Sequence, residues 1–166
     1  MKEKKYNYIF NWIQELSKIR PELGNFAVCP YASQAKFIIL DEELRKVRPR
    51  LGWEVVIYAV EDDHDEDFLY AMVDDYNRVY KNYKFIPDHR KVKTFINGVQ
   101  TNNGKYNLVL CQPRKDLTEA RKKLGKTNYY DYWDENYLQE VLEEDYKEVF
   151  HKKRQWMGIN KSKSTI

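Results

Sequence analysis

A single thiol lies in the segment of the chain that is richest in possible chemistry, Phe26-Ala-Val-Cys-Pro-Tyr-Ala32. Cys29 is followed by Pro30, and proline is favoured at the first position of a helix because its missing N–H would have no partner there. This order predicts a short helix over residues 30–35 with Cys29 at its N-cap. Free backbone N–H groups and the helix dipole stabilise a thiolate, so the pattern predicts a reactive thiol with a lowered pKa. The alternative is a small buried residue that packs the start of the helix against a strand.

A candidate base for this thiol follows the third predicted strand, in the pair Asp88-His89. Nucleophilic catalysis requires a thiol, a base and an orienting group within hydrogen-bond reach. His89 could be that base, and Asp88 its orienting group. The alternative is an exposed loop histidine in a basic run, since Arg90 and Lys91 follow it.

A second candidate set could bind a small anionic ligand. Cys111 ends a predicted strand, and Arg114 and Lys115 stand at the start of the helix that follows. Cationic side chains at a helix start can receive an anion. Together with Tyr31, from the thiol segment, these residues form the predicted ligand-binding set. The alternative is an ordinary basic surface.

Residues 61–67 are seven consecutive polar residues, six of them acidic. Carboxylate oxygens can hold a hard cation, but the run lacks the spacing and the turn glycine of an EF-hand loop. We interpret it instead as a solvated loop in which Asp65 caps the next helix. The chain also has no phosphate-binding glycine loop, dinucleotide-binding motif, His-Glu-x-x-His motif or Cys-x-x-Cys zinc pattern. We therefore predict neither a metal site nor a cofactor.

Composition places the chain among small globular proteins. It has 166 residues, of which 42% are hydrophobic and 33% charged, and a formal net charge of +3. This length predicts a single domain, residues 1–158, followed by a disordered Lys/Ser tail, residues 159–166. No apolar run is long enough to span a membrane, and no secretory signal precedes the two cysteines. We expect a soluble cytoplasmic protein that does not bind membranes and has two free thiols, with a Cys29–Cys111 bridge left open.

Hydrophobic periodicity and capping residues divide the chain into helices and short strands. Residues 53–60 are nearly all apolar, which is typical of a central strand buried on both faces. Asp65 is a strong N-cap for a helix over 66–83. The other helices are predicted at 5–20, 30–35, 42–47, 117–125 and 135–151, and the other strands at 36–40, 83–86 and 106–111.

Two further signals complete this prediction. Pro87 is expected to end the third strand, and residues 91–104 form a polar excursion with a turn at Asn97-Gly98. About four short strands in this order predict an α+β fold. We expect a two-layer α/β sandwich, ferredoxin-like, with the helices on one face.

The order of a Trp-containing helix, a Cys-Pro-aromatic-Ala motif at 29–32 and a strand resembles a bacterial family of unknown function. That family is marked by an Asn-Leu-Cys-Pro-Phe-Ala motif. Phe85-Ile86-Pro87 is similar to its Phe-His-Pro segment. The run from Thr101 to Tyr106, followed by Arg114, is similar to its Thr-Asn-Arg-Ser-Pro-Tyr and His-Leu-Leu-Arg runs.

The chain departs from that family at the histidines. Ile86 replaces the first, and Val109 or Leu110 replaces the second, so any role of those histidines in the family is lost here. The resemblance implies a fold and carries no activity. The composition also resembles small accessory proteins of marine tailed phages, which implies the host cytoplasm as location.

Two hypotheses of different classes follow, and the sequence leaves open whether the protein is an enzyme. In the first, a thiol-dependent enzyme or small anionic-ligand binder uses Cys29 beside Arg114 and Lys115. In the second, a non-catalytic accessory protein binds a host protein or a nucleic acid through a surface rich in tyrosine and lysine. The aromatic run 129–133 could stack on bases or anchor the last helix. A pocket that joins Cys29 to Cys111, His89 or Arg114 favours the first hypothesis.

Overall fold

The computed structural model describes residues 1–32 and 34–150. The chain divides into two compact units, Met1–Leu117 and Thr118–Ile166. The predicted tail, residues 159–166, lies outside the described residues, and the single domain over 1–158 stays a prediction.

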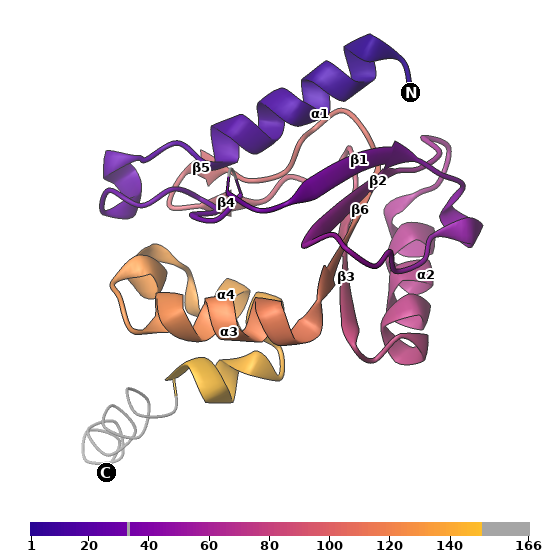
Figure 1. Cartoon of the computed structure of the whole chain (residues 1–166). Helices are drawn as coiled ribbons and strands as arrows, with labels where there is room; N and C mark the ends of the chain where they lie inside the picture. The colour runs from indigo at the N-terminus through magenta and orange to yellow at the C-terminus, as the bar shows by residue number, and fades with distance from the viewer. Residues whose placement is uncertain (33, 151–166) are drawn as a thin grey trace. The chain divides into compact units, whose positions relative to one another are not determined.

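A four-stranded sheet forms the centre of the first unit (Figure 1). Its spatial order is β1 (Phe37–Asp41), β2 (Val55–Ala59), β6 (Leu108–Pro113) and β3 (Tyr83–Asp88). β1 pairs parallel with β2, whereas β6 pairs antiparallel with both β2 and β3. β1, β2 and β3 therefore run in one direction, and their carboxyl ends meet at one edge of the sheet. The central strand predicted within 53–60 is confirmed as β2.

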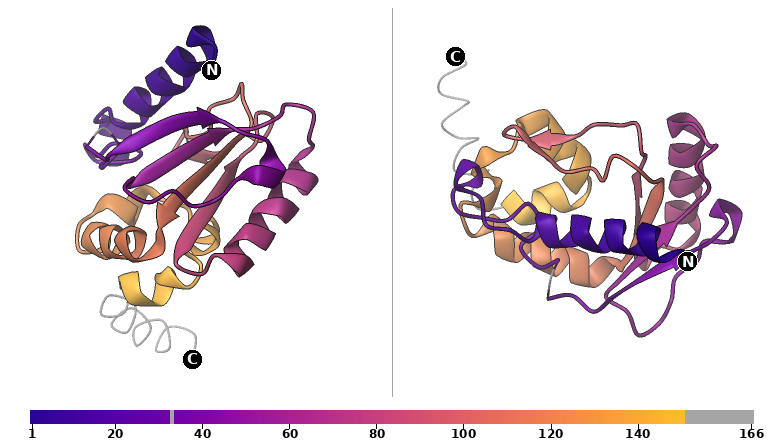
Figure 2. Two further views of the ribbon diagram at one scale, coloured as in Figure 1. Left: turned by 45° about the vertical axis from the view of Figure 1, so that its right-hand side comes forward. Right: turned by 90° about the horizontal axis from the view of Figure 1, so that it is seen from above.

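Helices cover both faces of this sheet (Figure 2). α1 (Glu3–Leu16) packs Ile9 and Ile13 on the face to which Ile57 points. α2 (Glu66–Val79) packs Leu69 and Val73 on the other face. β2 is apolar on both faces, so a helix on each face stabilises it. Burying one large apolar side chain contributes roughly 1.5–3 kcal/mol. The mixed α/β class is confirmed, the placement of helices on one face is wrong, and the ferredoxin-like topology is not confirmed.

The ends of several elements differ from the prediction. α1 ends at Leu16, and Ile19 beyond it is 71% exposed. Two single 3-10 turns, η1 (Pro21–Leu23) and η2 (Leu44–Lys46), follow, so the helix predicted at 42–47 is reduced to η2. β3 continues through Pro87, because an edge strand pairs on one side and tolerates a residue without an N–H.

The N-terminus of α2 follows the prediction. Asp65 accepts a hydrogen bond from the backbone N–H of Phe68 at 2.8 Å, which confirms the N-cap. The following residues Glu66 and Asp67 lie in the first turn, where the helix dipole favours negative charge.

The polar excursion between β3 and β6 forms a hairpin of β4 (Phe95–Ile96) and β5 (Val99–Gln100). Asn97 and Gly98 have φ angles of 46° and 83°, the left-handed values that a two-residue hairpin turn requires. This confirms the predicted turn. Tyr8 and Trp12 of α1 hold the excursion by donating hydrogen bonds to the main-chain oxygens of Asn103 (2.6 Å) and Thr101 (3.1 Å).

The second unit contains most of α3 (Arg114–Gly125), then η3 (Tyr129–Tyr132) and α4 (Glu135–Leu142). Asp134 caps α4 by accepting from the N–H groups of Asn136 and Tyr137. The helix predicted over 135–151 is interrupted after Leu142, where Glu143 adopts a φ of 47°, and residues 145–150 are helical again. In the described part of this unit, Tyr129 and Tyr130 are buried and contact the Trp133 ring, which favours the anchoring interpretation of 129–133.

Hydrogen bonds to Asp145 and a close approach at Gly125 stabilise the second unit. Arg121 donates to Asp145 at 2.9 Å, and both side chains are buried. Thr118 donates to the same carboxylate at 2.8 Å, so the buried charge is hydrogen-bonded on two sides. A Cβ on Gly125 would lie 2.5 Å from Val149 Cγ1, so glycine allows this close approach.

Candidate functional site

Cys29 lies in a turn, and the helix predicted at 30–35 is wrong. Its N–H donates to the Leu16 carbonyl at 2.9 Å, and its own carbonyl accepts from Ala32 at 3.2 Å. The described residues around it form separate turns and bends without a continuing helical ladder. Without a helix of several turns, no macrodipole acts on the thiol.

The pKa of the Cys29 thiol is raised, which contradicts the predicted lowering. Desolvation by surrounding protein atoms outweighs the hydrogen bonds from the backbone N–H groups of Tyr31 and Ala32. The residue as a whole is nevertheless exposed, so the thiol sits in a crowded but reachable position. A thiol of this kind is mostly protonated at neutral pH and is a poor nucleophile.

Cys111 is part of the hydrophobic core of the first unit. It is 2% exposed, and burial raises the pKa of its thiol to about 12. Its side chain packs in the cluster that also contains Val56 and Phe85. Cys111 therefore cannot contact a ligand at the surface, and both cysteines are free thiols.

Of the other predicted site residues, Tyr31 reaches Cys29 through its backbone N–H, and Asp88 lies at the opposite edge of the sheet. The Cys29 segment leads into the start of β1, whereas Asp88 pairs with Leu108 at the edge where β1, β2 and β3 end. Arg114 donates its N–H to Asn82 at 2.9 Å, and Lys115 and Tyr31 are exposed. Among the described residues no hydrogen bond joins Cys29 to His89, Arg114 or Cys111. An anion site at Arg114, Lys115 and Tyr31 stays a prediction.

His89 is 3% exposed, so neither the loop-histidine interpretation nor a role as base for Cys29 fits its surroundings. Its Nε2 lies 2.9 Å from the carbonyl oxygen of His64, and its Nδ1 accepts from the N–H of Lys91 at 3.1 Å. A carbonyl requires a donor and an N–H requires an acceptor, which assigns the proton of the neutral ring to Nε2. The imidazole thus links the loop after β2 to the loop after β3.

Asn107 makes a second link between the same two loops. Its side chain is fully buried, at 0% exposure. Its Oδ1 accepts from the N–H of Arg90 at 2.9 Å, and its Nδ2 donates to the carbonyl of Glu61 at 3.0 Å and that of His64 at 3.4 Å. This one amide therefore satisfies backbone groups on both loops at the start of β6.

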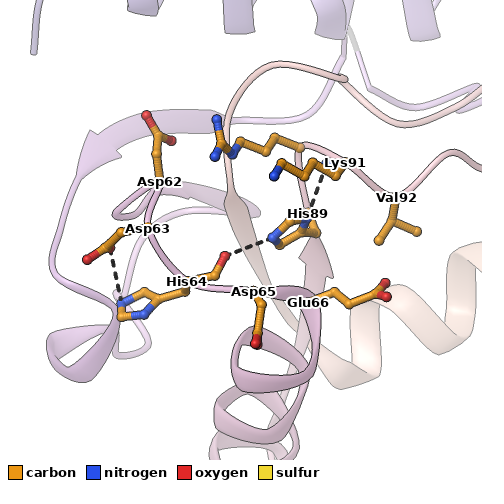
Figure 3. A pocket seen from close by; sticks show the side chains of 9 residues that line it. Asp62, Asp63, His64, Asp65, Glu66, His89, Lys91 and Val92 are labelled. Carbon is orange, nitrogen blue, oxygen red and sulfur yellow. Dashed lines mark hydrogen bonds and ion pairs between the residues drawn. The ribbon is translucent and has the colours of Figure 1, made fainter.

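Between the two loops lies a cleft of about 310 Å³ at the carboxyl edge of the sheet. Figure 3 shows Asp62 and Asp63 on one side, Lys91 and Val92 on the other, and the His89 ring between them with its bonds to the His64 carbonyl and the Lys91 N–H. The residues that line it are Asp62, Asp63, His64, Asp65, Glu66, His89, Arg90, Lys91 and Val92. Crevices outside the carboxyl ends of strands are the usual ligand sites of open α/β sheets.

The two walls of the cleft carry opposite charges. The loop wall contributes four carboxylates, one of which, Asp65, is occupied as the N-cap of α2. The facing wall contributes Arg90 and Lys91. The Nε atom of Arg90 is buried and has no acceptor among the described residues. Leaving a buried donor unsatisfied costs about 1–3 kcal/mol, so this atom is held at an energetic cost.

Asp88 is a half-buried carboxyl group at the end of β3, next to His89 in sequence. Burial raises its pKa from 3.8 to about 6, and hydrogen bonds from Asn103 oppose the shift. The N–H and Nδ2 of Asn103 both donate to Asp88 Oδ2, at 3.1 and 2.8 Å. Asn103 Oδ1 in turn accepts from the N–H groups of Lys105 and Tyr106. The carboxyl therefore anchors the excursion to the end of β3.

We expect the Asp88→Asn substitution to change how stability depends on pH. The pKa of the Asp88 carboxyl is higher in the folded protein than in the unfolded chain, so the folded state binds its proton more tightly. Stability from this group is therefore fully present below about pH 4 and is lost as pH rises through about 6. The loss is of order 2–3 kcal/mol. An asparagine oxygen still accepts from Asn103, so the variant should be at least as stable as the wild type at neutral pH.

Urea unfolding at a series of pH values between about 4 and 7 checks this expectation. The difference in free energy of unfolding between variant and wild type should grow with pH. Parallel pH profiles for the two proteins would contradict it. Asp63→Asn, at a carboxylate whose side chain is 83% exposed, is the matched control and should leave the profile unchanged.

Sequence reasoning did not find the residues that organise the cleft. Asn107 stands directly before the apolar run 108–111, and Asn103 lies in the run Thr101-Asn-Asn-Gly104. The available signal was a polar residue adjoining a buried strand, which is weak because strand ends are often polar. In residues 1–32 and 34–150, no group of His, Cys, Asp and Glu side chains converges on a possible metal position.

No family model, no curated protein and no solved structure matches the chain. The likeness to the family with the Asn-Leu-Cys-Pro-Phe-Ala motif, and that to tailed-phage accessory proteins, stay predictions. None of the described helices has the length and apolar character that a membrane crossing needs.

Proposed function

We propose that the protein is a non-catalytic binding protein, and that its cleft takes a basic segment of a partner protein. The proposal refines the hypothesis of a protein-binding accessory protein. The observation that carries it is an acidic loop wall that His89 and Asn107 hold rigidly against the opposite wall. Preorganised walls lower the ordering cost of binding.

The acidic wall supports a cationic occupant. Asp62, Asp63 and Glu66 are exposed, and their like charges repel one another at close range. A lysine or arginine side chain between them relieves that repulsion and is attracted by all of them. The cleft volume of about 310 Å³ lies at the lower end of the range of ligand pockets, which suits one or two side chains.

The wall that contains Arg90 and Lys91 favours a peptide as the occupant of the cleft over a simple cation. A peptide carries carbonyl oxygens beside its cationic side chains, and Arg90 and Lys91, which line the cleft, can donate to them. A bare metal ion or a polyamine has no such oxygen. The cleft lining includes no Cys, Ser or Thr that could act as a nucleophile, which supports binding over catalysis.

The test uses the full chain and two short synthetic peptides, one alternating lysine with glycine and the other alternating glutamate with glycine. Titration calorimetry should detect the lysine peptide alone, with an affinity that falls as salt is added. Asp62→Lys should weaken binding at least about tenfold, which corresponds to ~1.4 kcal/mol. Glu140→Lys is the control of equal charge change, because Glu140 is an exposed residue of α4, and it should bind like the wild type.

Three results would overturn the proposal. They are equal binding of both peptides, no binding of the lysine peptide at low salt, and an equal loss in the Asp62→Lys and Glu140→Lys variants. Calcium ions alone binding at the same carboxylates and excluding the peptide would favour a metal site in its place.

A further inference from the structure

β1 is an edge strand whose outer side is unpaired within the described residues. It is the first strand in the sheet order and pairs with β2 alone. The carbonyl of Lys36 accepts from Val55, and the N–H of Glu42 donates to Ala59. In a parallel ladder the residues that bond one neighbour alternate with those that face away. Phe37, Ile39 and Asp41 therefore direct their N–H and C=O groups outward.

This edge lacks the usual protection against strand addition. Four apolar residues, Phe37 to Leu40, run in sequence with no proline or charge among them. The opposite edge strand, β3, contains Lys84 and Pro87. Natural sheets normally blunt their edges with charges, prolines or a covering element. β1 carries one charge, Asp41 at its end, where it is ion-paired with Lys5, and the rest of its edge is open to an added strand.

Exposed aromatic rings of α1 lie beside this edge, on the face of the sheet that α1 covers. Tyr6 and Phe10 of α1 are 40% and 36% exposed, and their rings stack with centroids 6.1 Å apart. The Phe10 ring lies 6.2 Å from that of Phe37 in β1. A strand added to β1 would therefore also meet an apolar surface from α1.

We propose that a second copy of this chain pairs antiparallel with β1, with the two-fold axis at Ile39. In this register Ile39 faces Ile39 of the second copy, and Phe37 faces Asp41. These are the residues whose backbone groups point outward, so each facing pair can exchange N–H···O=C bonds. The interface is isologous, as closed dimers usually are. It joins the two sheets into one and is independent of the cleft.

Charge complementarity selects this register and this occupant. With Ile39 on the axis, Lys36 faces Glu42 of the second copy, and symmetry repeats the pair at the other end. Lys36 is exposed and Glu42 is half-buried. Moving the register by two residues in one direction places Lys36 opposite Leu40 and Glu42 opposite Gln34. Moving it in the other direction places Lys36 opposite Leu44 and Glu42 opposite Ile38. Both shifts lose the two Lys36–Glu42 pairs. Opposite charges that face each other across strands stabilise the pairing, and like charges destabilise it.

Sedimentation velocity of the full chain over a range of concentrations tests the proposal. The wild type should show a reversible monomer–dimer equilibrium. Lys36→Glu and Glu42→Lys should each weaken the dimer at least about tenfold, because each creates two facing pairs of like charge. Lys36→Gln should weaken it less, since it removes the attraction without adding repulsion. Circular dichroism and melting temperature verify that each variant is folded.

Mixing the two charge variants gives the decisive measurement. A Lys36→Glu chain beside a Glu42→Lys chain restores opposite charges at both ends, so the mixture should form a dimer that contains one chain of each. The double variant Lys36→Glu/Glu42→Lys should dimerise like the wild type. A wild type that stays monomeric at all concentrations would overturn the proposal, and so would a dimer that is indifferent to these charges or a mixture that stays monomeric.

Discussion

Replacing Ile57 with aspartate should unfold the first unit. Ile57 is 3% exposed on β2, in register with Ile39 on one side and Leu110 on the other. Its side chain packs against α1 in a cluster with no charged member. An unpaired buried charge costs several kcal/mol, against a total stability of about 5–15 kcal/mol. We expect the loss of the cooperative unfolding transition in far-ultraviolet circular dichroism and a soluble yield far below that of the wild type.

Ile57→Val is the matched control. It removes one methylene from the same site and should cost about 0.5–1.5 kcal/mol with the transition intact. A soluble Ile57→Asp protein with a wild-type transition would contradict the central placement of β2.

The parts of the fold that the sequence predicted are those fixed by local chemistry. β2 is an uninterrupted apolar run, and such a run has few alternatives to a central strand. Asp65 caps α2 because its carboxylate reaches the N–H of Phe68 within one turn. The Asn97-Gly98 turn follows from the positive φ that both residues tolerate. Each of these signals involves neighbours in sequence.

The errors arose where distant residues decide the outcome. Which face a helix covers depends on the sheet it meets, and periodicity alone does not specify that. The helix expected after Cys29 depends on Pro30 alone, and the chain instead forms turns whose first N–H bonds Leu16. Pro87 is a strand breaker in general, but β3 has an unpaired side that tolerates it.

The candidate site was the least predictable part for the same reason. The residues around Cys29 predict a reactive thiol, yet desolvation raises the pKa of that thiol. The sequence is compatible with His89 as a base or as an exposed loop residue, whereas the structure has it as a buried link between two loops. Such a role requires a backbone carbonyl from a segment 25 residues away in sequence.

Asn107→Leu should destabilise the first unit and abolish peptide binding together. Leucine has a similar volume but no polar atoms, so the N–H of Arg90 and the carbonyl of Glu61 lose their partner. Each unsatisfied buried group costs about 1–3 kcal/mol, which predicts a loss of roughly 2–6 kcal/mol in free energy of unfolding. The carbonyl of His64 keeps its bond from His89. Urea unfolding measures the loss, and calorimetry with the lysine peptide measures binding.

Hydrogen exchange locates the effect. The amide of Arg90 is protected by Asn107 in the wild type, and it should exchange faster in the variant than amides at the centre of β2. Asn7→Leu, at an exposed position of α1, is the control for adding an apolar side chain and should change stability little. An Asn107→Leu protein as stable as that control would mean that the two loops hold their positions without this amide. A stable Asn107→Leu variant that still binds the peptide would show that Asn107 has no role in organising the cleft.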